Sequence, residues 1–175
     1  MGCWKWYRVV KLVFFYSDVV SNSQITKRIL KFFFIFLSMM RKIAAIILEN
    51  EEGELLLYLR DNKPGIPFPQ HWDLIGGHVE EGETPEEALR REVKEELNYD
   101  LKDYKFFKTY VCLEGDAYPN TKYIYYGKFN LPLEEITLYE GERAQYFKKE
   151  EIASVKFANM LKEIVLEYIA GNKIP

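Results

Sequence analysis

The sequence has few cysteines, and those present are far apart. Cys3 and Cys112 have neither the spacing of a metal-binding motif nor that of a redox motif. This argues against a disulfide framework and fits a reducing compartment, so we expect a cytoplasmic protein.

The sequence also lacks a basic excess and a long hydrophobic run. Lys and Arg number 24 against 27 Asp and Glu, a net charge of −3, so a nucleic-acid polymer is not the expected partner. The longest apolar run, residues 32–40, falls far short of the roughly 20 residues that a membrane-spanning helix needs. The 175 residues contain no internal repeat, and 48% of them are apolar, which suits one domain with a substantial core.

Composition changes sharply near Met40. Residues 1–40 contain six basic side chains, one acidic side chain and ten of the 28 aromatic residues. We therefore treat residues 1–39 as a leader and residues 40–175 as the domain. Three interpretations of the leader stay open: a mis-set translation start with Met39 or Met40 as the true first residue, a membrane-surface anchor, or an accessory element that covers the domain or completes a homodimer.

Beyond Met40 the apolar pattern predicts strands separated by two helices. The strands are expected at Lys42–Leu48, Leu55–Arg60, Trp72–Val79, Lys105–Leu113, Lys122–Leu131 and up to Tyr146–Phe147. The helices are expected at Pro85–Leu97 and Phe157–Ala170, with Gly171 as the stop signal of the second. This order predicts an α/β (α+β) fold, with a mixed β-sheet that carries helices on its faces.

The first helix has clear boundaries. Thr84 is the expected N-cap, Pro85 fits the first helical position and Glu87 completes a capping box. Asn98 can adopt the left-handed conformation that ends a helix.

One face of this helix is rich in carboxylates. At about 100° per residue, Glu92, Glu95 and Glu96 lie close together, with Ala88 among them. Leu89, Val93 and Leu97 form a neighbouring stripe that can face the core. Hard divalent cations bind such carboxylates together with substrate phosphates. For the helix alone, however, a solvated face with pairs such as Glu87–Arg91 explains the charges as well.

The residues upstream of the helix favour the metal site. The string Gly77-x5-Glu83-x7-Arg91-Glu92-Val93-x-Glu95-Glu96-x-Asn98-Tyr99 closely resembles the Nudix box, G-x5-E-x7-R-E-U-x-E-E-x-G-U, in which U is aliphatic. Every charged position of the pattern is present at its spacing. The sequence departs from the pattern at Asn98, which replaces a glycine, and at Tyr99, which replaces an aliphatic residue; Asn is the usual substitute for Gly in a helix cap.

The resemblance implies a Nudix-type α/β/α sandwich and a set of residue roles. Glu92, Glu95 and Glu96 would bind Mg²⁺ or Mn²⁺ with the carbonyl of Gly77, and Glu92 is also a candidate general base. Arg91 would orient Glu92, and Glu83 would brace the junction of loop and helix. In this family a distal glutamate often completes the site, for which Glu140 is our first choice and Glu142 our second.

The resemblance identifies the substrate less closely than the site. Phe68 and Trp72 are candidates to stack on a base, as is Tyr125, although packing explains these rings equally well. Arg60 is a further candidate for substrate binding. Asn159 occupies the place where one branch of the family binds a purine, although a plain N-cap explains it too. His78 could touch phosphate, but a solvated histidine is the simpler interpretation.

We therefore expect a metal-dependent hydrolase acting on a nucleotide-like small molecule. The first choice of substrate is a (deoxy)nucleoside triphosphate, oxidised forms included, cleaved to monophosphate and pyrophosphate. The alternative is ADP-ribose or another nucleoside diphosphate linked to a small group. A hypothesis of another class is a catalytically silent nucleotide-binding module, although such domains usually lose glutamates that are all present here.

Overall fold

A computed structural model describes residues 28, 31, 35 and 40–171 of the chain. The interpretations of the leader, residues 1–39, concern a segment that lies almost wholly outside the described residues. The strands are β1 (Arg41–Glu49), β2 (Leu55–Leu59), β3 (Trp72–Asp73), β4 (Ile75–His78), β5 (Tyr104–Cys112), β6 (Asn120–Lys128) and β7 (Arg143–Phe147). The α-helices of the domain are α3 (Pro85–Leu97) and α4 (Leu161–Gly171), with short 3-10 helices at Leu133–Glu135 and Ile152–Ser154.

The strands form one mixed sheet built around β1. Its main path runs β3-β2-β1-β6-β5, while β4 pairs with β1 and β7 pairs with β2. The long β1–β6 pairing is parallel, from Arg41 opposite Asn120 to Glu49 opposite Lys128, and the other pairings are antiparallel. The mixed sheet predicted from the sequence is confirmed.

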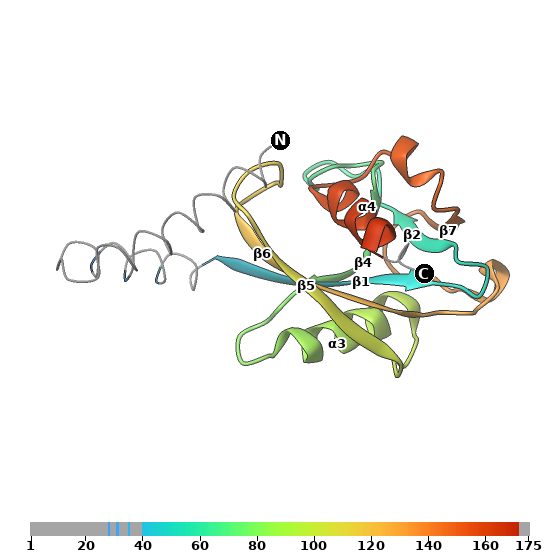
Figure 1. Ribbon diagram of the computed structural model, residues 1–175, viewed down its shortest axis with the longest axis horizontal. Coiled ribbons are helices and arrows are strands. Elements are labelled where there is room, and N and C mark those ends of the chain that lie inside the picture. Colours follow the sequence, from blue (N-terminus) through green and yellow to red (C-terminus); the bar gives the residue numbers. More distant parts are fainter. Residues whose placement is uncertain (1–27, 29–30, 32–34, 36–39, 172–175) are drawn as a thin grey trace.

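The two helices lie on opposite faces of the sheet, which gives three layers (Figure 1). Alternate residues of β1 supply both cores, because successive side chains of a strand point to opposite faces. Ala44, Ile46 and Leu48 pack on the α3 side, and Ala45 and Ile47 pack on the α4 side. This is the sandwich that the resemblance implied.

Helix α3 forms as its sequence signals predict. The Thr84 side chain accepts a hydrogen bond from Glu87 N, and the Glu87 carboxylate accepts one from Thr84 N, so the capping box is present. Asn98 ends the helix in the left-handed conformation with φ 50°. The buried stripe contains the expected Leu89, Val93 and Leu97, and also Ala88. Ala88, which we expected among the glutamates, packs into the core, and Glu96 is buried as well.

Three other expectations needed correction. The expected strand Trp72–Val79 is broken at Leu74, because β3 pairs with β2 whereas β4 pairs with β1. Strand β6 begins at Asn120, earlier than expected, and ends at Lys128. Helix α4 begins only at Leu161, because Phe157 forms a β-bridge with Trp72 and Asn159 has φ 53°, outside the helical region.

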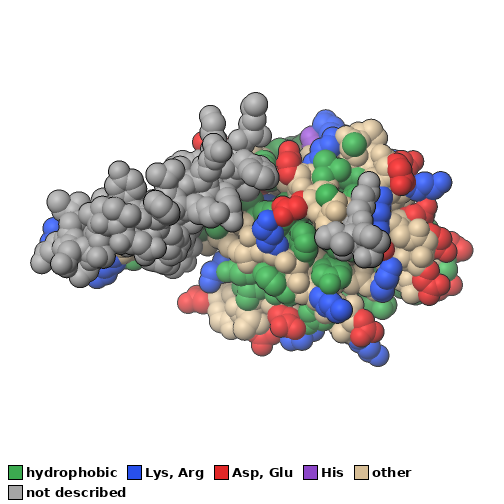
Figure 2. All heavy atoms as spheres, in the orientation of Figure 1, with side chains coloured by type: hydrophobic (Ala, Val, Ile, Leu, Met, Phe, Trp, Pro, Cys, Tyr) green, Lys and Arg blue, Asp and Glu red, His purple; other side chains and the backbone are tan. Residues whose placement is uncertain are grey.

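The surface carries charges of both signs. On the face shown in Figure 2, basic and acidic side chains are interspersed, as the near-neutral net charge leads one to expect. Among the described residues, no helix combines the length and the apolar character needed to cross a bilayer.

Candidate active site

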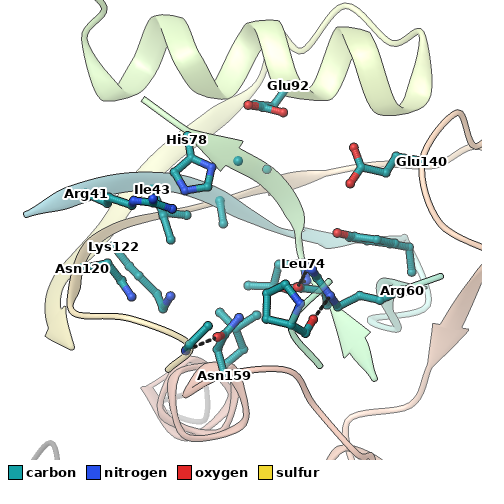
Figure 3. Close-up of a pocket in the computed structure, with 18 of the residues that line it drawn as sticks. Arg41, Ile43, Arg60, Leu74, His78, Glu92, Asn120, Lys122, Glu140 and Asn159 are labelled. Atoms are coloured by element: carbon teal, nitrogen blue, oxygen red, sulfur yellow. Dashed lines mark hydrogen bonds and ion pairs between the residues drawn. The ribbon is translucent and has the colours of Figure 1, made fainter. Parts of the chain in front are cut away.

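A pocket of about 410 Å³ lies between α3 and α4, at one end of the sheet (Figure 3). Carboxylates from α3 and from the segment after Leu138 line one side, and we call Glu92, Glu96 and Glu140 the carboxylate side. Basic and amide side chains line the other side, and we call Arg41, Asn120, Lys122 and Asn159 the β6 side. The pocket therefore presents an acidic half and a basic and amide half to one ligand.

The pocket opens at the point along β1 where its pairing with β2 ends and its pairing with β4 begins. The β1–β2 pairs are Leu48 with Leu56 and Glu49 with Leu55, whereas β4 pairs with residues 43–46. Two glycines make this geometry possible. Gly76 has φ 137°, and a Cβ there would collide with the Ala44 carbonyl. A Cβ at Gly77 would collide with the Glu92 carboxylate, so the glycine pair lets Glu92 lie directly against β4.

The three glutamates of α3 differ in exposure. Glu96 is buried, with 4% of its surface exposed, and its Oε2 accepts a hydrogen bond from Gly76 N at 3.3 Å. Glu92 is half-buried and lines the pocket. The Glu95 side chain is 60% exposed and does not line the pocket. The helix therefore directs Glu92 and Glu96 into the pocket and leaves Glu95 at its margin.

Arg91 fixes this arrangement from the side. Its Nε and Nη2 donate to the two oxygens of Glu83 at 2.8 and 3.0 Å, and Nη2 also donates to the His78 carbonyl at 2.9 Å. Its Nη1 donates to Glu92 at 2.8 Å and to Glu95 at 3.3 Å. The hydrogen bonds from Arg91 lower the pKa of Glu83 to about 2. Arg91 thus ties the loop before α3 to the carboxylates.

Full ionisation of the glutamates on the carboxylate side is unfavourable. Burial, and then the charge of Glu140, raise the pKa of Glu96 to about 9. Burial is also the largest cause that raises the pKa of Glu92, despite its bond to Arg91. Groups that lose their charge for these reasons regain it when a cation lies between them. The donor set, made only of carboxylate and carbonyl oxygens, is the kind that Mg²⁺ and Mn²⁺ prefer.

These glutamates do not form a closed cage. Within the described part of the chain, no three acidic, histidine or cysteine side chains are grouped as a ready-made metal site. Figure 3 shows Glu92 on α3 and Glu140 on a separate segment, with a gap between them. Mg²⁺ sites typically combine one or two carboxylates with water and substrate phosphates, so an open set of this kind fits such an ion.

The β6 side holds a buried ion pair that the sequence did not suggest. Lys122 Nζ lies 2.5 Å from Asp116 Oδ2, and the two side chains are 2% and 1% exposed. Asp116 Oδ2 also accepts from Asn120 Nδ2 at 2.5 Å, while its Oδ1 accepts from Met160 N at 2.8 Å. Asp116 therefore connects β6 to the segment that leads into α4.

The mouth of the pocket carries a small aromatic cluster. Tyr118 Oη lies 2.7 Å from His78 Nε2, the two rings stack, and the Arg41 guanidinium lies 4.4 Å from the centre of the Tyr118 ring. Burial and the charges of Arg41 and Lys122 lower the pKa of His78. His78 therefore lines the pocket with a hydrogen-bonded ring, and the residue is exposed, as the simpler interpretation of a solvated histidine expected.

The expected substrate-binding residues divide into two groups. Arg60 lines the pocket and forms an ion pair with Asp73 at 2.8 Å. Asn159 lines it too, and its Oδ1 accepts from Ala117 N at 3.3 Å, so its side chain joins the loop before β6 and serves no cap.

The aromatic candidates lie outside the lining of the pocket. Trp72 packs edge-on against Phe147, with ring centroids 4.7 Å apart, and Phe68 contacts the ring of His71. Tyr125 packs in the core on the α3 side. Glu142, the second choice for the distal glutamate, accepts from Asn62 N instead of facing the pocket, whereas Glu140 lines it.

Comparison with known proteins identifies the family. The NUDIX domain model matches residues 39–168, which is most of the chain. The chain therefore belongs to the Nudix family, as the box predicted. The nucleoside triphosphatase NudI of Salmonella schwarzengrund is 49% identical over 61 residues, which cover 35% of this chain and 42% of that protein. The chain thus matches less than half the length of this relative.

Solved structures share the fold over most of the domain. A MutT structure from a study of the Aliivibrio salmonicida and Vibrio cholerae proteins matches with a TM-score of 0.60 and 23% identity, over 75% of this chain and 98% of that one. The NUDIX domain of Shewanella oneidensis NrtR, solved with ADP ribose, matches with a TM-score of 0.65 and 15% identity, over 77% and 89% of the two chains. At these identities the likeness shows the fold alone.

Proposed function

We propose that the protein is a pyrophosphohydrolase that cleaves a (deoxy)nucleoside triphosphate to the monophosphate and pyrophosphate with the help of Mg²⁺ or Mn²⁺. The observation that carries the proposal is the convergence of Glu92, Glu96 and Glu140 on one pocket, where burial and mutual repulsion raise the pKa of Glu96 to about 9. Such crowding has a natural explanation in a bound cation.

The residues around the pocket can each be given a role. Glu92, Glu96 and Glu140, with the backbone at Gly77 and with Glu95 at the margin, would hold the ion, which neutralises the diphosphate and lowers the pKa of water when bound. Glu92, oriented by Arg91, accepts the proton of the attacking water. The new bond joins the water oxygen to phosphorus, and the bond to the bridging oxygen breaks. Glu83 acts only through Arg91.

The substrate class rests on the relatives and on the pocket. The partial match to a nucleoside triphosphatase favours a nucleoside triphosphate. ADP-ribose, the ligand of the NrtR domain, is the second candidate. On the β6 side, Asn120 and Asn159 offer uncharged hydrogen-bonding groups, which suit a base at that end, with the phosphates at the carboxylate side. Arg60 and Asn159 lie where they could contact either substrate.

The test is product release from a panel of nucleoside triphosphates and ADP-ribose with Mg²⁺, with Mn²⁺ and with chelator. We expect metal-dependent release of pyrophosphate and a higher kcat/KM for a triphosphate than for ADP-ribose. A clear preference for ADP-ribose would promote the second candidate. Binding without turnover of any substrate in the panel would instead indicate a nucleotide-binding module.

A further inference from the structure

Asn120, at the start of β6, has an amide whose orientation is fixed by its neighbours. Its Nδ2 donates to Asp116 Oδ2 at 2.5 Å and to the Tyr118 carbonyl at 2.9 Å. Both partners can only accept hydrogen bonds, since a carboxylate and a carbonyl oxygen carry no proton. Exchanging the amide oxygen and nitrogen would replace two hydrogen bonds with two repulsive contacts. The nitrogen therefore faces Asp116, and Oδ1 is the atom left over.

That oxygen has no partner. Asn120 is only 1% exposed, and its Oδ1 is the one buried side-chain polar atom without a hydrogen bond in the part of the chain that the structure describes. Leaving such an atom unpaired costs about 1–3 kcal/mol. Asn120 lines the pocket, and Figure 3 shows it projecting from β6 beside Lys122. A group that enters the pocket can supply the missing donor.

The surroundings determine what that group is. Lys122 is neutralised by Asp116, and the lone pairs of Asn120 Oδ1 would repel a phosphate oxygen. An acceptor oxygen is thus disfavoured beside Asn120 Oδ1, whereas a hydrogen-bond donor is favoured there. The N–H groups of a nucleobase can supply this donor, and Lys122 Nζ, which shares Asp116 Oδ2 with Asn120, has further N–H bonds for a neighbouring acceptor on the same base.

We propose that Asn120 is a specificity-determining residue, whose Oδ1 accepts a hydrogen bond from an N–H of the substrate's base while Asp116 and Lys122 hold the amide in place. This inference rests on the proposed function for its substrate. It sets the direction in which the nucleotide lies, with the base over the start of β6 and the phosphates at the carboxylate side.

The test compares substrates with their counterparts in which methyl groups replace the N–H. For wild type we would measure kcat/KM for three pairs of triphosphates: uridine and 3-methyluridine, guanosine and 1-methylguanosine, and adenosine and N6,N6-dimethyladenosine. We expect the preferred base to be favoured over its methylated counterpart by about tenfold to a hundredfold, the range for a buried polar group left unpaired. In Asn120→Leu, of similar volume, this ratio should fall to about one.

The ratio of kcat/KM for the two substrates of a pair is measured on the same protein. A loss of folded protein therefore affects both values equally and does not change the ratio. Asn120→Ser, which keeps a hydroxyl donor for Asp116 but not the Oδ1 position, should lose the discrimination as well, and serves if Asn120→Leu does not fold. Thr121→Val, on the same strand but facing the other side of the sheet, should keep the wild-type ratio. Discrimination that survives in both Asn120 variants would show that a group other than Asn120 Oδ1 recognises the N–H, and would overturn the inference.

Failure of the proposed function would look different. In that case wild type hydrolyses no triphosphate, and the same pairs are then compared by calorimetric binding in the presence of Mg²⁺. A binding preference for the unmethylated base that is lost in Asn120→Ser would support the role of Asn120 without hydrolysis. Equal binding of both members of every pair by wild type would overturn it.

Discussion

The two sides of the pocket handle buried charge in opposite ways. On the carboxylate side Glu96 is buried near Glu92 and Glu140, and burial, followed by these like charges, raises its pKa. On the β6 side Lys122 and Asp116 are at least as deeply buried, but they neutralise each other. The first arrangement would weaken the fold in the absence of the proposed cation, whereas the second stabilises the fold by itself. We therefore propose that buried charge serves cation binding on the carboxylate side and structure on the β6 side.

Removing a glutamate from the carboxylate side should have the largest effect on activity. We expect Glu92→Gln, which removes the candidate base, to lower kcat by about 10²–10⁴-fold, the range for general acid–base catalysis. Glu96→Gln should also reduce turnover strongly, because it removes a charge from the cation site without changing its shape. The measurement is steady-state hydrolysis of the best triphosphate at saturating Mg²⁺.

A matched control is available on the same helix. Glu86 lies on the exposed face of α3, where its carboxylate accepts from Tyr104 Oη at 2.8 Å, a bond that glutamine can retain. Glu86→Gln should keep nearly wild-type activity. Near wild-type turnover in Glu96→Gln would contradict the proposal that the carboxylate side belongs to the active site.

Removing a charge from the β6 side should instead destabilise the protein. Lys122→Met leaves Asp116 buried without its cation, which typically costs about 3–5 kcal/mol. The double variant Lys122→Met/Asp116→Asn should recover part of this loss, since neither charge remains. Urea denaturation measures both. A single variant as stable as wild type would mean that the ion pair does not support the fold.

The pH dependence of stability should separate the two sides further. Glu96 has a pKa of about 9 in the folded protein and an ordinary value, near 4.5, when unfolded. Between these values the folded state binds the extra proton, so this contribution to stability is complete below the lower value and is lost as pH rises through the higher one. Without metal, Tm should therefore fall over this window, and Glu96→Gln should flatten the decline.

Added metal tests whether a cation stabilises the folded protein by binding among these glutamates. Millimolar Mg²⁺ or Mn²⁺ should raise Tm by mass action, and more at alkaline pH, where less protonation competes with the ion. Differential scanning calorimetry with chelator as the reference measures the shift. An absent shift with either ion at every pH would contradict a cation site among these glutamates.

The carboxylate side was largely predictable from the sequence, because its signals are local. Thr84, Glu87 and Asn98 set the ends of α3, and the spacing of Glu92 and Glu96 placed both on the pocket side. Sequence could not grade their exposure, which depends on the strand that α3 packs against. The burial of Ala88 and Glu96 illustrates this: helical spacing gives neighbours on a helix, but it does not say where the core begins.

Apart from Asn159, the β6 side was not predicted, because its residues meet only through the parallel β1–β6 pairing and the turn before α4. Asp116, Lys122 and Asn159 come from separate segments, and a lysine in an aromatic strand suggests an exposed position. One signal was available. Asn120 and Lys122 are two residues apart in a strand, so they share a face with Ile124, which is fully buried. Polar residues on a buried face require partners, and that requirement points to a site.

The smallest expected effect concerns Trp72, which the sequence suggested as a ring that stacks on the substrate's base. Trp72 packs against Phe147, lies under the Arg143 guanidinium at 5.5 Å, and is hydrogen-bonded through its backbone to residues that precede α4. Trp72→Phe should therefore cost about 0.5–1.5 kcal/mol of stability, the value of an aromatic pair, and should change KM by less than about twofold. Urea denaturation and steady-state kinetics on one preparation separate these effects. A KM raised about tenfold at unchanged stability would indicate that Trp72 contacts the substrate. It would also mean that the base does not lie over Asn120.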